Sequence, residues 1–107
     1  MNNFRKLIVW QKSIELMKDI YFLTKLLPKE EKYNLVNQLT RCAVSIPSNI
    51  AESCSRSSVK DFRRFIEISL GSAFELETQL VIILETKYST KLVIEPIFLK
   101  LMRFRKC

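Results

Sequence analysis

The residues that most often carry enzyme chemistry are sparse in this sequence of 107 residues. There is no histidine, the commonest general base, and the three cysteines have no histidine to activate them or to complete a zinc site. Glu75 and Glu77 are two positions apart on a predicted helix, so their carboxylates diverge and form no acid–base pair. One glycine is too few for a phosphate-binding loop or a dinucleotide fingerprint. We therefore expect a protein that is not an enzyme and that needs no metal or cofactor.

The chemistry that the sequence does offer is cationic. Its 18 lysines and arginines outnumber 11 acidic residues, which gives a net charge of +7 and predicts a polyanionic partner, either nucleic acid or an anionic membrane surface. The basic residues cluster near the start, around residues 56–64 and at the end. The candidate nucleic-acid-binding residues come from these clusters and from one arginine of the second predicted helix, Arg41. They are Arg5, Lys6, Arg41, Arg56, Lys60, Arg63, Arg64, Arg103 and Arg105. The alternative for each cluster is an ordinary solvated helix face.

The cysteines indicate a reducing compartment. Cys42 and Cys54 are separated by roughly 18 Å along one predicted helix, too far to form a disulfide. The apolar run before Gln11 is too short for a signal peptide, and no run approaches the roughly 20 residues that span a bilayer. We expect a cytoplasmic protein that does not enter a membrane.

Hydrophobic spacing predicts four helices joined by short connections. Their expected ranges are about 9–27, 31–53 and 59–88, followed by a fourth that starts after Ser89 or Thr90 or has Pro96 in its first turn, near 95–106. We predict a single all-α domain over residues 1–107, an up-down-up-down four-helix bundle whose second helix is kinked at Pro47. This topology would bring the three basic clusters to one end of the molecule.

Short polar residues surround Pro47 in the second predicted helix. Ser45, Ser48 and Asn49 can bond backbone groups that the proline leaves free. Asn49 and Glu52 have the spacing of a capping box, which predicts that the helix starts afresh after the proline. One interpretation is a packed, kinked helix, and the other is a kink that presents Arg41 and the polar residues to a partner.

The third predicted helix has two apolar stripes. A bundle seam follows alternating steps of four and three through Phe62, Ile66, Ser69, Ala73, Leu76, Leu80 and Ile83. The candidate oligomer interface is a second stripe, Leu70, Phe74, Val81 and Leu84, whose alternative role is to widen the core. Gly71 beside Ser72 predicts a close approach between helices.

The run from Gln38 to Glu52 resembles the bacterial four-helix-bundle proteins, also called 23S ribosomal-RNA intervening-sequence proteins. Their pattern, Gln-Leu-Arg-Arg-Ala-Ala-x-Ser-Ile-Pro-x-Asn-Ile-Ala-Glu-Gly, differs here mainly at Thr40, Cys42 and Ser53. Residues 9–12, 27–31 and 71–78 also match, so the resemblance covers nearly the whole chain. The matching motif residues are Trp10, Gln38, Arg41, Ser45, Pro47, Asn49, Glu52, Gly71, Ser72 and Glu75.

This resemblance implies a basic four-helix bundle without catalytic activity that forms homopentamers and binds nucleic acid, RNA more than DNA. Acidic residues that match the family, Glu31, Glu52, Glu75 and Glu77, are expected to pair with basic residues such as Arg41 between helices or subunits. A related branch assists retroelement reverse transcriptases, so the main alternative is a protein–protein adaptor with little nucleic-acid affinity. A bundle bound to a membrane surface is a third hypothesis, weakened because packing uses the apolar faces.

Overall fold

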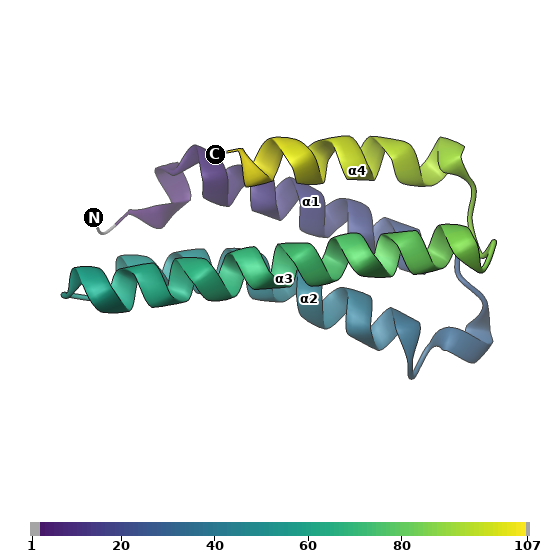
Figure 1. Ribbon diagram of the computed structural model, residues 1–107, viewed down its shortest axis with the longest axis horizontal. Coiled ribbons are helices and arrows are strands. Elements are labelled where there is room, and N and C mark those ends of the chain that lie inside the picture. The colour runs from purple at the N-terminus through teal and green to yellow at the C-terminus, as the bar shows by residue number, and fades with distance from the viewer. Residues whose placement is uncertain (1–2, 107) are drawn as a thin grey trace.

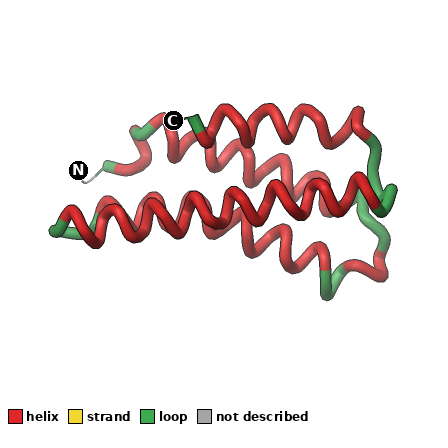
Figure 2. The backbone as a smooth tube through the Cα atoms, viewed as in Figure 1, coloured by secondary structure: helices red, strands yellow, loops and turns green. Residues whose placement is uncertain are grey.

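The computed structural model describes residues 3–106, which form four α-helices and no strand. The bounds are α1 Ile8–Thr24, α2 Leu35–Cys54, α3 Val59–Glu85 and α4 Lys91–Arg105, with the short 3₁₀ helices η1 Phe4–Lys6 and η2 Lys29–Glu31. The chain reverses direction at each connection (Figure 1), and the connections are short (Figure 2). Since α1 and α3 each pack against α2 and α4, the four helices surround one core. The predicted all-α four-helix bundle is confirmed.

Local signals explain where α3 begins and ends. The Ser58 hydroxyl accepts a hydrogen bond from the Asp61 backbone N–H at 3.1 Å, as the spacing of these residues predicted. The helix ends at Glu85, three residues earlier than expected, because Lys87 adopts a left-handed φ of 62°. The Tyr88 N–H then bonds the Ile83 carbonyl at 3.1 Å, which closes a Schellman turn without glycine.

The fourth helix starts after Thr90, which was one of the two predicted starts. Pro96 therefore lies inside α4 and not in its first turn. The carbonyl that a proline leaves unbonded belongs to the residue four positions earlier, here Leu92. Leu92 is 87% exposed, so the residue whose carbonyl loses its helical bond lies on the surface of the bundle.

The core is aliphatic and uses one stripe from each helix. In α1 the core takes Leu16, Ile20 and Leu23, which are buried. A neighbouring line of apolar residues on the same helix is half-buried or exposed, and consists of Trp10, Ile14, Met17 and Tyr21. Across the chain, the buried apolar residues of this core are Leu16, Ile20, Leu23, Leu27, Leu35, Leu39, Cys42, Ala43, Ile46, Ile50, Ala73, Leu76, Leu80, Ile83, Ile94, Ile97, Leu101 and Phe104.

The most extensive helix contact is between α2 and α3, and two of its hydrogen bonds involve Ser45 and Ile46, just before Pro47. Small residues of α3 lie against this part of α2 and bond it directly. The Ser69 hydroxyl donates to the Ile46 carbonyl at 3.0 Å, and the hydroxyls of Ser45 and Ser72 are 2.8 Å apart. These hydrogen bonds between the two helices therefore fix which part of α3 lies against the part of α2 that contains Pro47.

Three expectations for α2 and α3 are wrong. The helix does not restart after Pro47, because α2 is continuous and Asn49 donates its side-chain N–H to the Ser45 carbonyl at 2.8 Å. Gly71 does not serve a close approach within the chain, since it is exposed and an added Cβ would meet no atom within 4 Å. Phe62 is 41% exposed and does not join the core, because α3 projects beyond α1 and α4 at its start (Figure 1). The kink at Pro47 stays a prediction.

Leu76→Ala should lower the free energy of unfolding by about 2–5 kcal/mol, because it removes a fully buried side chain and leaves a cavity. Leu92→Ala is the matched control, and we expect a change within about 0.5 kcal/mol at this exposed position. Urea unfolding followed by circular dichroism measures both. Equal effects of the two substitutions would contradict the core described here.

Candidate nucleic-acid interface

The three basic clusters gather at one end of the bundle. The start of α1, the end of α2, the start of α3 and the end of α4 all lie on the left in Figure 1. Arg5 and Lys6 form the last turn of η1, immediately before α1, and both are exposed. This end therefore combines residues that are up to a hundred positions apart in the sequence.

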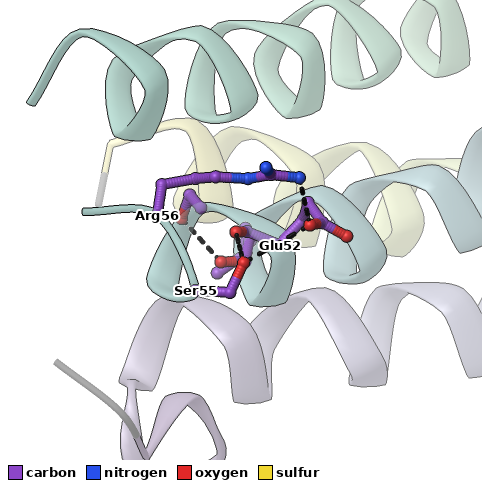
Figure 3. A network of polar contacts seen from close by, with 5 residues as sticks. Glu52, Ser55 and Arg56 are labelled. Carbon is purple, nitrogen blue, oxygen red and sulfur yellow. Dashed lines mark hydrogen bonds and ion pairs between the residues drawn. The ribbon is translucent and has the colours of Figure 1, made fainter. Parts of the chain in front are cut away.

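Arg56 follows the end of α2 and is held in place by its neighbours. Figure 3 shows its guanidinium reaching back to Glu52, with Nη2 2.5 Å from the carboxylate Oε2. The Ser55 hydroxyl lies 2.7 Å from the Glu52 carbonyl and 3.3 Å from the same Oε2. On its other side, the Arg56 guanidinium carbon is 4.5 Å from the centroid of the Phe65 ring. Glu52 thus pairs with Arg56 within one helix turn and not with Arg41.

Two basic residues of α4 are also paired. Arg105 bonds Glu77 of α3, and its guanidinium carbon lies 4.3 Å from the centroid of the Phe74 ring. Lys100 Nζ is 2.7 Å from Asp19 Oδ2 of α1. These ion pairs tie α4 to its two neighbouring helices. Glu77 thus pairs with a basic residue of another helix, as expected, and its partner Arg105 is one of the candidate nucleic-acid-binding residues.

The start of α3 carries three cations without an ion pair. Lys60, Arg63 and Arg64 are exposed, and none forms an ion pair among the described residues 3–106. Arg64 has only a distant ring contact, 5.9 Å from the Phe65 centroid. Because this segment projects from the bundle, a large polyanion can approach it from several sides.

A hollow of about 630 Å³ continues the basic surface between α1 and α4. Its lining combines three cations with one carboxylate and two uncharged side chains. The residues are Ile8, Gln11, Lys12, Glu15, Lys100 and Arg103. Arg103 was one of the candidate nucleic-acid-binding residues and Lys12 was not, and the structure places both in the lining of this hollow.

Five of the motif residues line a separate hollow of about 130 Å³ between α2 and α3, together with Cys42. They are Gln38, Arg41, Ser45, Ser72 and Glu75. The Cys42 thiol is buried here, 3.4 Å from the Ser72 carbonyl oxygen and 3.6 Å from Glu75 Oε2. Burial and then the negative charge of Glu75 raise the pKa of Cys42 to about 12, and Arg41 acts in the opposite direction. The thiol therefore stays protonated and is a poor nucleophile.

A family model described as "23S rRNA-intervening sequence protein" matches residues 5–107. The chain belongs to this family. The match includes both the basic end and the α2–α3 motif, as the resemblance drawn from residues 38–52 implied. No curated protein matches the chain.

A solved structure of another protein has the same fold as this chain. It is a protein of unknown function from the S23 ribosomal protein family of Bacteroides thetaiotaomicron, 32% identical to this chain. The alignment covers 92% of this chain and 93% of that one, with a TM-score of 0.85. The bundle seen here is therefore shared by both proteins over nearly their whole lengths.

In this family member, the stripe predicted to be an oligomer interface is largely open. Leu70, Phe74 and Val81 are exposed, whereas Leu84 is half-buried and packs against the core. We call Leu70, Phe74, Val81 and Leu84 the α4-side stripe, because Leu84 lines a hollow with residues of α4 and Arg105 of α4 covers Phe74. Leu84 contributes to the bundle itself as well as to this stripe.

Two other features are absent from the part of the chain that the structure describes. Within residues 3–106, no helix is long and apolar enough to cross a bilayer. The same residues contain no group of three or more cysteine, aspartate or glutamate side chains placed to hold a metal ion.

Cys42 should react with iodoacetamide about a thousandfold more slowly in the folded protein at pH 8 than in urea, because its raised pKa leaves very little thiolate. Glu75→Gln should speed this reaction, since it removes the second cause of the pKa shift. Peptide mapping by mass spectrometry, with the chain in urea as the control, measures the Cys42 rate separately. Equal rates in the folded and unfolded chains would contradict the environment described for this thiol.

Proposed function

We propose that the protein is a non-enzymatic, cytoplasmic, homo-oligomeric nucleic-acid-binding protein that binds RNA in preference to DNA. The observation that carries this proposal is the gathering of Arg5, Lys6, Lys60, Arg63 and Arg64 at one end of the bundle, all of them exposed. Exposed lysines and arginines bind phosphates and release the counterions of a nucleic acid, which is the main source of affinity in such complexes. The preference for RNA is supported by the family description, which refers to 23S rRNA.

In this proposal the nine candidate residues have different roles. The exposed cations of η1 and α3 contact phosphates directly, and Arg103 adds charge at the hollow beside α1. Arg56 and Arg105 shape the surface, since their ion pairs and ring contacts hold them in place. Arg41 lines the hollow between α2 and α3 and does not belong to the basic end.

Oligomerisation would multiply the basic surface. A homopentamer presents five copies of this end, so several weak phosphate contacts act together. The α4-side stripe supports the proposed assembly because three of its four apolar residues are exposed in the single chain. A chain that oligomerises but does not bind RNA would favour the adaptor hypothesis instead.

Replacing Lys60, Arg63 and Arg64 together by glutamine should weaken binding to a structured ribosomal RNA fragment and reduce the steepness of its salt dependence. If each residue contacts one phosphate, the slope of log K against log salt should fall in magnitude by about 2–3. Fluorescence anisotropy over a series of salt concentrations measures this slope, with an unrelated duplex as the second ligand.

The matched control replaces Lys25, Lys29 and Lys91 by glutamine, which removes the same charge from exposed positions at the other end of the bundle. We expect the control to change the slope by less than half as much. Equal effects of the two triple substitutions would show that binding depends on total charge and not on the basic end. No RNA binding by the unaltered protein at low salt would overturn the proposed function.

A further inference from the structure

The first turn of α3 exposes an aromatic ring that the core does not use. Phe62 was predicted to join the bundle seam, yet it is 41% exposed. Val59, one turn earlier on the same side of the helix, is 73% exposed. Because α3 projects beyond α1 and α4 at this end (Figure 1), these two helices do not cover the ring. The exposed ring therefore needs an explanation other than packing within the bundle.

The other phenylalanine of this segment is already in contact with cations. Phe65 is half-buried, and the guanidinium carbon of Arg56 lies 4.5 Å from its ring centroid, with that of Arg64 at 5.9 Å. Phe62, by contrast, has no ring contact and no cation–π contact with any of residues 3–106. Phe62 is thus the ring of this segment whose face is open to a flat ligand.

The open ring lies directly beside the cations of the same turns. Successive residues are about 100° apart around a helix axis, so Lys60, Arg63 and Arg64 share an arc of about 100°. Phe62 lies about 100° beyond the Arg63 edge of this arc, with Val59 between them. A charged chain that follows the cationic side of the helix can therefore turn its attached groups toward Phe62.

A ligand that fits this surface must combine regularly spaced negative charges with flat apolar rings. A nucleic acid whose bases are unpaired has both, since each nucleotide offers a phosphate and a base with an open face. In a regular duplex the bases are stacked on one another inside the helix, so their faces cannot reach a protein side chain. Every base has such a face, so recognition of this kind tolerates many sequences.

We propose that the start of α3 selects unpaired nucleotides, with Phe62 stacked on a base and Lys60, Arg63 and Arg64 on the flanking phosphates. This inference rests on the proposed function and names the form of nucleic acid that the basic end prefers. The preferred ligands are single strands and the loops and bulges of folded RNA, and regular duplexes bind less well. The cations then provide affinity for any nucleic acid, and Phe62 determines the specificity.

An anionic membrane surface is the other ligand that basic and apolar side chains together can bind. A helix that lies in a membrane surface has an apolar side that continues over several turns. In α3 the side that begins at Val59 and Phe62 turns into the bundle within two turns, because Ile66 packs against the core and Ser69 is buried. The exposed apolar surface is therefore large enough for a base and too short for a membrane helix.

Three RNA ligands of equal length separate stacking from charge. They are a single strand of about 12 nucleotides without self-complementarity, the same strand annealed to its complement, and a strand with the same phosphates whose central nucleotides lack bases. Phe62→Leu keeps an apolar side chain but removes the ring, so it should weaken binding to the intact single strand about fivefold or more. Binding to the duplex and to the abasic strand should change by less than about twofold, since neither offers a base to Phe62. Fluorescence anisotropy measures all three affinities.

The salt dependence distinguishes Phe62 from the cations. Phe62→Leu should leave the slope of log K against log salt unchanged, because no phosphate contact is lost. The matched control is Phe22→Leu, the same substitution at a ring that is 64% exposed near the other end of the bundle, and it should alter none of the three affinities. Circular dichroism confirms that both variants are folded.

A larger ring at the same position gives a direct signal of stacking. Phe62→Trp should bind the intact single strand at least as tightly as the wild-type protein does, because indole retains an open aromatic face. Its added fluorescence should be quenched by the intact strand more than by the abasic strand. The wild-type protein, whose one tryptophan is Trp10, supplies the background.

The outcomes separate this inference from the proposed function. Single-strand binding that Phe62→Leu leaves unchanged, or an equal loss for all three ligands, would overturn the stacking role and leave the proposed function standing. No binding of the wild-type protein to any of the three ligands at low salt would overturn both. Vesicles of phosphatidylcholine and phosphatidylserine complete the test. If Phe62→Leu abolishes vesicle binding but leaves RNA binding unchanged, the ring serves a membrane surface and the inference is wrong.

Discussion

The contact between α2 and α3 at Pro47 is the constraint on which most of the structure depends. The helices bond through Ser69 and the Ile46 carbonyl, and through the hydroxyls of Ser45 and Ser72. These bonds fix the register of α3, because sliding the helix by one turn would leave buried polar groups without partners. Once α3 is placed, Leu76, Leu80 and Ile83 face the core, and the start of the helix projects beyond the bundle.

The same register separates two surfaces with different chemistry. The projecting start of α3 carries Lys60, Arg63 and Arg64, whereas the middle of the helix presents Glu75 and Gln79 next to α2. A surface of one charge sign attracts a polyanion from a distance, and a surface with both signs favours a specific partner. One helix thus presents a surface of a single charge sign and a surface of mixed charge at a fixed separation.

The ion pairs show why a basic sequence does not translate directly into a basic binding site. Arg56, Lys100 and Arg105 pair with Glu52, Asp19 and Glu77. Such pairs on a protein surface contribute little to stability, but they hold long side chains in one orientation. The effective charge at the basic end is therefore smaller than the count of lysines and arginines indicates.

The sequence by itself determined the helices, their order and the family, because hydrophobic spacing and the motif around Pro47 are local features. It also indicated the Ser58 cap and the three basic clusters. Only the tertiary structure decided which arginines are paired, that Phe62 and Gly71 are exposed, and that Gln79 is buried without a partner. These properties depend on which helix lies opposite each residue and on how far each helix extends. No local pattern in the sequence encodes either of them.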